Sequence, residues 1–146
     1  MNPQAHRPTG AFIGASWAAL LVGGTAYMAG LWNAGMPLNE KGYYFILFMY
    51  GLFAAVSLQK SVRDRLEGIP VTAIYFGLCW FSLGLCLLLL TIGLWNASSV
   101  TNSEKGFYAM AYLFSLFAVV AIQKNVRDVA LLDEKTGVHD LPSDGL

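Results

Sequence analysis

The chain has 146 residues, of which 56% are hydrophobic and 12% are charged, and its formal net charge at pH 7 is zero. About a quarter of the residues of an average soluble domain are Asp, Glu, Lys or Arg, so this composition argues against a water-soluble protein and indicates a bilayer protein. A neutral chain also gives no support for nucleic acid as a partner.

Four stretches of the chain contain no Asp, Glu, Lys or Arg: 8–39, 42–59, 68–103 and 106–123. A hydrocarbon core of about 30 Å is crossed by roughly 20 apolar residues in a helix, so each stretch can hold one spanning helix. We predict these helices at Ala11–Trp32, Gly42–Leu58, Val71–Trp95 and Gly106–Gln123. The second and fourth are short, so we expect them to begin in the preceding polar loop.

The first apolar stretch follows Arg7, which is also the order found in a secretory signal peptide. However, its uncharged run is far longer than the ~7–15-residue core of a signal peptide. Its end, Gly30–Ala34, also recurs at the end of an internal span. We therefore predict a helix that is retained in the mature protein.

The second half of the chain repeats the first half. The matched segments are GLWNA at 30–34 and 93–97, EKG at 40–42 and 104–106, and QKSVRD at 59–64 with QKNVRD at 123–128. Each copy crosses the bilayer twice, so both copies enter from the same side. The sequence thus predicts an all-α membrane protein, whose four transmembrane helices form two tandem helical hairpins related by a pseudo-two-fold axis along the membrane normal.

These repeats divide the chain into an N-terminal tail (1–10), a first two-helix repeat (11–65), a linker (66–70), a second two-helix repeat (71–128) and a C-terminal tail (129–146). Lys and Arg are concentrated at the tails and near the linker, whereas the two loops within the repeats hold only Lys41 and Lys105. The positive-inside rule therefore predicts that both termini face the cytoplasm and that the EKG loops face outward.

The doubled motifs resemble those of the YiaA/YiaB family of bacterial inner-membrane proteins, specifically its longer YiaA-type members with two copies of a two-helix domain. Four motifs carry the resemblance: Ser-Trp or Cys-Trp, Gly-Leu-Trp-Asn-Ala, Glu-Lys-Gly with a following aromatic pair, and Gln-Lys-x-Val-Arg-Asp. Each occurs twice in the same order between about Gly14 and Asp128. The resemblance implies a bacterial inner-membrane location and a two-hairpin helical fold, but it brings no catalytic residues because the family is largely uncharacterised.

Each outer loop carries a predicted helix start. Asn39 and Ser103 are good N-cap residues directly before Glu-Lys-Gly. Glu40 and Glu104 then fall in the first turn, where the helix dipole favours an anion. We interpret these residues as a device that begins the second helix of each hairpin.

Lys41 and Lys105 do not suit a helix N-terminus, where a cation is disfavoured. We therefore expect each to contact either lipid phosphate or the ring face of Trp32 or Trp95 across the hairpin. Trp32 and Trp95 end their spans where an interfacial aromatic belt is expected.

Two further pairs of repeated residues lie in the outer turns. Asn33 and Asn96 are expected to cap the preceding helix ends, with a polar binding role as the alternative. Gly42 and Gly106 are expected to let the two arms of each hairpin approach closely. Small residues four apart, such as Ala19–Gly23 on the first helix, give weak support for tight packing within the bilayer.

A second set of charges repeats at the opposite ends of the helices, and its members are Lys60, Arg63, Asp64, Lys124, Arg127 and Asp128. The cations are typical of anchors that reach the lipid surface. The carboxylates are unexpected, because a helix C-terminus disfavours an anion. Either each Asp pairs with the Arg of the other copy, or the charges form solvated pairs within their own helices.

Candidate residues for chemistry are few. Cys79 and Cys86 lie seven apart inside an apolar span, which is neither a metal-binding nor a loop-disulfide spacing, so buried thiols are expected. His6 and His139 lie in the tails, and no predicted span therefore holds a haem-ligating His. We expect no cofactor, no metal and no enzymatic activity.

Proton-coupled transport needs an ionisable group inside the membrane, and the predicted spans contain no Asp or Glu. The Ser and Thr side chains of the spans are expected to bond to their own helices. The sequence favours an uncharacterised structural, assembly or stress-related accessory component of the inner membrane. The alternative is an oligomeric pore or a small-solute transporter without an embedded coupling residue. Expected partners are membrane lipids, and either further copies of the chain or another membrane protein.

Overall fold

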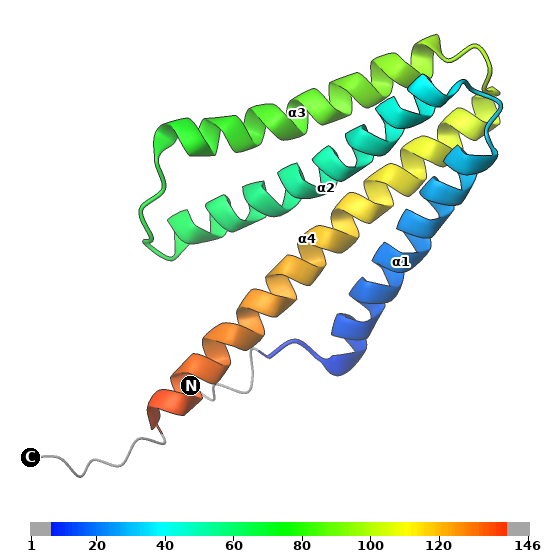
Figure 1. Cartoon of the computed structure of the whole chain (residues 1–146). Coiled ribbons are helices and arrows are strands. Elements are labelled where there is room, and N and C mark those ends of the chain that lie inside the picture. Colours follow the sequence, from blue (N-terminus) through cyan, green and yellow to red (C-terminus); the bar gives the residue numbers. More distant parts are fainter. Residues whose placement is uncertain (1–6, 140–146) are drawn as a thin grey trace, which may run out of the picture.

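The computed structural model describes residues 7–139, which form four α-helices: α1 (Gly10–Asn33), α2 (Leu38–Leu66), α3 (Ala73–Asn96) and α4 (Asn102–His139) (Figure 1). All four helices are long and apolar enough to cross a membrane. The predicted all-α membrane protein with four spans is therefore confirmed. His6 lies outside the described residues.

The helices alternate in length: α1 and α3 have 24 residues each, whereas α2 has 29 and α4 has 38. As expected, α2 and α4 begin inside the polar loops. They also continue through the repeated charged motif, so their apolar parts are only a portion of each helix. In Figure 1 the C-terminal part of α4 projects beyond the other helices.

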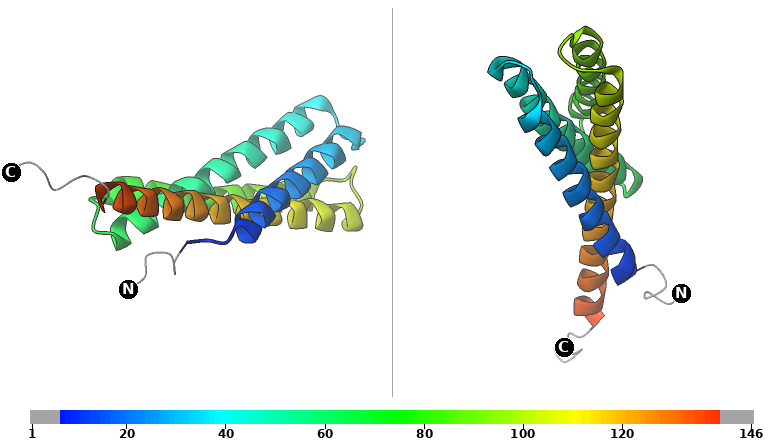
Figure 2. Two further views of the ribbon diagram at one scale, coloured as in Figure 1. Left: turned by 90° about the horizontal axis from the view of Figure 1, so that it is seen from below. Right: turned by 90° about the vertical axis from the view of Figure 1, so that its right-hand side faces the viewer.

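The two hairpin turns, 34–37 and 97–101, lie at one end of the bundle. The start of α1, the end of α2 and the end of α4 lie toward the opposite end (Figures 1 and 2). This arrangement is the one required of a chain that crosses the bilayer an even number of times. We call the two ends the turn end and the charged end.

Helices pack mainly between the two repeats rather than within them. α1 lies along α4, α3 lies along α2, and α2 and α4 contact each other between these pairs, whereas α1 and α2 touch much less. The hairpins are thus open, and each arm has its main partner in the other copy. This contact pattern is compatible with the expected pseudo-two-fold relation, which exchanges α1 with α3 and α2 with α4.

The first glycine of the GLWNA motif in each repeat lies against the aromatic pair that follows the EKG motif of the other repeat. A Cβ atom on Gly30 of α1 would lie 3.0 Å from the Phe107 ring and 3.1 Å from the Tyr108 ring of α4. Its counterpart Gly93 of α3 has the same relation to the Tyr43–Tyr44 pair of α2, at 2.9 and 3.1 Å. The aromatic pair of each copy is therefore accommodated by the glycine of the other.

Two other glycines make room for neighbouring side chains. A Cβ atom on Gly23 would lie 2.7 Å from Ser115 Oγ, and one on Gly51 would overlap the Tyr112 hydroxyl. By contrast, a Cβ atom on Gly42 or Gly106 would meet no atom within 4 Å. The expectation that these two glycines allow close approach of the hairpin arms is wrong, because the arms diverge after the turn.

An aromatic cluster fills the centre of the bundle toward the turn end. Tyr27 stacks on Phe48 with ring centroids 4.6 Å apart, and Tyr112 meets Phe48 edge-on at 6.0 Å. Both tyrosines are completely buried. The Tyr27 hydroxyl donates to the Tyr44 carbonyl at 2.9 Å, and the Tyr112 hydroxyl donates to the Leu47 carbonyl at 2.9 Å. Their polar groups are thus satisfied inside the bilayer, where an unpaired hydroxyl would be costly.

The close approach at Gly51 predicts that Gly51→Ala destabilises the bundle by about 1–3 kcal/mol, the usual cost of overpacking a filled core. Gly42→Ala is the matched control, because the same methyl group enters open space on the same helix. Unfolding of the full chain in detergent measures both effects. Equal stability of the two variants would contradict the tight contact between Gly51 and Tyr112.

Candidate functional site

The turn end holds the first set of predicted residues. The Asn33 side-chain amide donates to the Ala29 carbonyl at 2.8 Å, and the Asn96 amide donates to the Ile92 carbonyl at 2.9 Å. Each side chain therefore bonds back to the carbonyl four residues earlier in its own helix. The C-cap residues are Ala34 and Ala97, whose backbone N–H groups bond to the Leu31 and Leu94 carbonyls, so the capping role expected of Asn33 and Asn96 stays a prediction.

The predicted N-caps are wrong, because both helices begin before Asn39 and Ser103. The residue preceding α4 is Thr101, whose hydroxyl accepts a bond from the Glu104 amide at 3.3 Å. The Glu104 carboxylate accepts in return from the Thr101 amide at 2.7 Å. This reciprocal pair is a capping box. In the first copy the N-cap is Pro37, which has no N–H to donate and makes no side-chain cap bond.

The two acidic residues stay in the predicted place, since Glu40 and Glu104 lie in the first turns of α2 and α4. The neighbouring Lys41 ammonium donates to the Trp32 carbonyl at 2.8 Å, at the end of α1. Lys41 thus contacts the backbone of Trp32 across the hairpin, whereas the expected alternatives were its ring face or lipid phosphate. Lys105 instead lines a cavity of about 570 Å³ together with Trp95.

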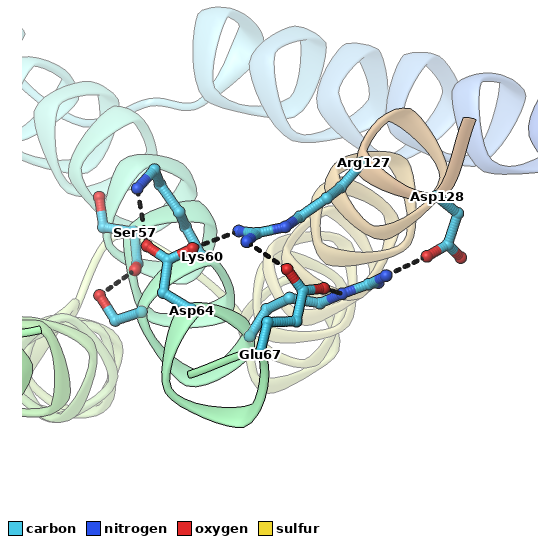
Figure 3. Close-up of polar contacts among 8 residues, drawn as sticks. Ser57, Lys60, Asp64, Glu67, Arg127 and Asp128 are labelled. Carbon is cyan, nitrogen blue, oxygen red and sulfur yellow. Dashed lines mark hydrogen bonds and ion pairs between the residues drawn. The ribbon is translucent and has the colours of Figure 1, made fainter. Parts of the chain in front are cut away.

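The charged end holds the second set, and here the repeats are joined by ion pairs (Figure 3). Arg127 on α4 reaches Asp64 on α2 at 2.6 Å, and Arg63 on α2 donates to Asp128 on α4. The same carboxylates also accept from lysines four residues earlier, Lys60 at 2.9 Å and Lys124 at 2.8 Å. The two arrangements left open by the sequence therefore occur together.

Sequence reasoning missed Glu67, which directly follows α2 and joins both arginines. It accepts from Arg63 at 2.7 Å and from Arg127 at 2.7 Å. These hydrogen bonds, that from Arg63 first, hold the pKa of the Glu67 carboxyl below its usual range. The matched position of the other repeat is Leu131, so repetition could not reveal the residue. Its spacing of four from Arg63 was the available signal.

Burial separates the arginines of this cluster from its lysines. The side chains of Asp64 and Arg127 are 8% and 15% exposed, whereas those of Lys60 and Lys124 are 56% and 54% exposed. Charge-assisted bonds between partly desolvated groups are stronger than exposed pairs, although desolvation offsets part of the gain. The arginine–carboxylate bonds therefore fix α2 against α4, and the lysines point to the surroundings.

A second polar contact lies deeper, between each outer helix and its partner. The Asn125 amide donates to Ser16 Oγ at 3.3 Å between α4 and α1. At the matched positions, Ser61 Oγ and Cys79 Sγ lie 3.5 Å apart between α2 and α3. Cys79 and Cys86 are free and buried, which confirms the predicted thiols.

The charged end acts as a clamp between the two repeats. Both carboxylate oxygens of Asp64, Glu67 and Asp128 accept from arginine or lysine donors, and the buried polar pairs hold the helices in register. The hydrogen bonds of Tyr27, Asn125 and Arg127 join one helix to another helix, or to Glu67 directly after the end of α2. This arrangement can bind and orient helices.

Comparison with known proteins gives a family match that covers most of the chain. The model described as "yiaA/B two helix domain" matches residues 12–64 and again residues 75–128. The chain is 53% identical over 121 residues to the "Inner membrane protein YiaA" of Escherichia coli (strain K12), covering 83% of each chain.

A second relative is the "Uncharacterized membrane protein YubF" of Bacillus subtilis (strain 168). It is 32% identical over 74 residues, which are 50% of this chain and 85% of the relative. No solved structure matches the chain. The similarity therefore extends to bacterial membrane proteins whose names state a location and no activity.

The bond between Arg127 and Asp64 predicts coupling in a double-mutant cycle of Asp64→Asn and Arg127→Gln. Because both side chains are largely buried, we expect a coupling energy above the ~0–1 kcal/mol that is usual for exposed pairs. Unfolding of the wild type, both single variants and the double variant in detergent measures it.

The control cycle uses Arg7 and Asp133, whose charged groups lie 3.8 Å apart and whose side chains are 55% and 62% exposed. Its two effects are expected to add within about 0.3–0.5 kcal/mol. Simple addition at Asp64 and Arg127 as well would show that the buried bond between the repeats is not formed.

Proposed function

The chain belongs to the yiaA/B two helix domain family of membrane proteins, and from this premise we propose that it is a non-enzymatic accessory component of the bacterial inner membrane. In this role it supports the packing or assembly of another membrane protein. The observation that carries the proposal is that the buried polar side chains form hydrogen bonds and ion pairs with other parts of the same bundle.

The hydroxyl groups within the spans illustrate this use. Ser16, Thr91 and Ser115 each donate to the carbonyl four residues earlier in their own helix, all at 2.8 Å. Such bonds satisfy the hydroxyl within the helix. These groups therefore favour a structural role over one in guiding a polar solute.

The filled centre of the bundle supports the same proposal. Side chains from all four helices form one buried cluster, and Tyr27, Cys86 and Tyr112 within it have no exposed surface. A solute that crossed a single copy would have to displace these close-packed groups. A pore would instead need a path between copies, which makes the oligomeric state the decisive difference between the two functions.

The outer surfaces of α1 and α3 are where a partner would dock. Trp17 on α1 and the matched Trp80 on α3 are 48% and 52% exposed. Aromatic side chains are enriched in protein interfaces because they bring large contact areas at low entropic cost. We propose that these two faces contact the partner within the bilayer.

We further propose that both termini and the 66–70 linker face the cytoplasm, following the distribution of Lys and Arg. Reporter domains fused after Arg65 and at the C-terminus should both register as cytoplasmic. A reporter inserted near Ser99 should register as extracytoplasmic. An extracytoplasmic signal from the C-terminal fusion would contradict this orientation.

The accessory role predicts that gentle native extraction recovers the chain together with a discrete membrane protein of different sequence. Trp17→Ala and Trp80→Ala should reduce the recovery of that protein, whereas Trp32→Ala at the turn end should leave it unchanged. Mass spectrometry of the extracted complexes measures the recovery. A homogeneous oligomer of this chain that conducts ions or small solutes in liposomes would instead establish the pore.

A further inference from the structure

A groove runs along the bundle where α3 and α4 fail to meet. α3 packs on α2 far more than on α4, so a space of about 490 Å³ remains between the three helices. Figure 1 shows α2 between the other two helices over much of this length. The walls are apolar and include Leu58 of α2, Leu83 and Leu87 of α3, and Leu113 and Phe117 of α4.

Polar groups line the groove only from α2 and α4, close to the charged end. They are Gln59, Arg63 and Lys124. The Lys124 side chain is 54% exposed and gives one hydrogen bond to Asp128, although an ammonium group has three N–H donors. The carbonyl oxygen of Gln59 is buried and has no hydrogen-bond partner within residues 7–139. The Lys124 ammonium therefore offers unused hydrogen-bond donors to the groove.

The net charge of this region is positive. The ion-paired cluster contains four cations, Lys60, Arg63, Lys124 and Arg127, against three carboxylates, Asp64, Glu67 and Asp128, which leaves an excess of one positive charge. An apolar channel that ends in excess positive charge is complementary to a molecule with a long apolar chain and an anionic head.

We propose that this groove binds an anionic phospholipid. One acyl chain fills the apolar length between α3 and α4, and the phosphate accepts hydrogen bonds from Lys124 and Arg63. Filling the groove restores the dispersion contacts that an empty apolar space loses, and basic pockets between spanning helices recognise lipid head groups in this way.

The internal repeat provides a matched control for the charge. Lys60 and Lys124 occupy matched positions, are 56% and 54% exposed, and bind the carboxylate four residues later at 2.9 and 2.8 Å. Only Lys124 lines the groove. Binding of a lipid in the groove should therefore depend more on Lys124 than on Lys60, although the two lysines are otherwise alike.

The test is native mass spectrometry of the full chain in detergent, titrated with phosphatidylglycerol or with phosphatidylethanolamine of the same acyl chains. We expect one tightly bound phosphatidylglycerol and weaker binding of phosphatidylethanolamine. Lys124→Gln should weaken phosphatidylglycerol binding about five-fold, the change expected for one cation near a membrane surface. Lys60→Gln removes the same charge outside the groove and should weaken binding less, and equal effects of the two substitutions would overturn the site.

A second pair of variants tests the acyl-chain part independently of charge. Leu87→Trp adds a bulky ring to the groove and should abolish the bound lipid, whereas Leu88→Trp adds the same ring to an adjacent, 55% exposed position outside it. Unfolding in detergent without added lipid establishes that both variants fold. Wild-type lipid binding by Leu87→Trp, or a dimer that Leu87→Trp disperses while no lipid binds, would overturn the proposal.

Discussion

Close contact between the glycine of one repeat and the aromatic pair of the other is the constraint on which this bundle depends. Lipid tails are as apolar as the helix surfaces, so burial alone does not drive spanning helices together, and close packing must do so. Gly30 and Gly93 remove the side chains that would keep the outer helices away from the Phe107–Tyr108 and Tyr43–Tyr44 pairs. The duplicated motif of the turn end is therefore one half of a contact whose other half lies in the other copy.

Ion pairs perform the corresponding task at the charged end, where α2 and α4 would otherwise separate. The reciprocal arginine–carboxylate bonds follow the repeat, but Glu67 adds a bridge that exists once. The repeat is also broken in the centre of the bundle, where the positions that match the buried Tyr27 and Tyr112 are Leu90 and Phe48. Both departures add hydrogen bonds that the repeated sequence lacks, so the two copies have become complementary parts of one structure.

The number of spans was predictable because it depends on local apolar length, and the repeat was predictable because the two halves keep the same motifs in the same order. The pairing of Asp64 with Arg127 was one of two predicted alternatives, since repetition suggests a reciprocal contact but cannot choose between neighbours. The N-cap of α4 was misplaced because Thr101, two residues earlier than Ser103, makes the reciprocal bonds with Glu104, and that of α2 because the helix begins directly after Pro37. The role expected for Gly42 and Gly106 was wrong, since sequence does not reveal which arm packs against which. Glu67 escaped notice because it has no counterpart.

The exchange of partners between hairpins also has a consequence for biosynthesis. The main partner of α1 is α4, and the bond between Ser16 and Asn125 joins residues 109 positions apart. Since a chain is made from its N-terminus, α1 enters the bilayer long before the helix that will cover it has left the ribosome. Its small-residue face must stay in lipid, or be shielded by the insertion machinery, until nearly the whole protein has been synthesised. Packing of α4 against α1 is therefore the step that fixes the position of α1 in the bundle.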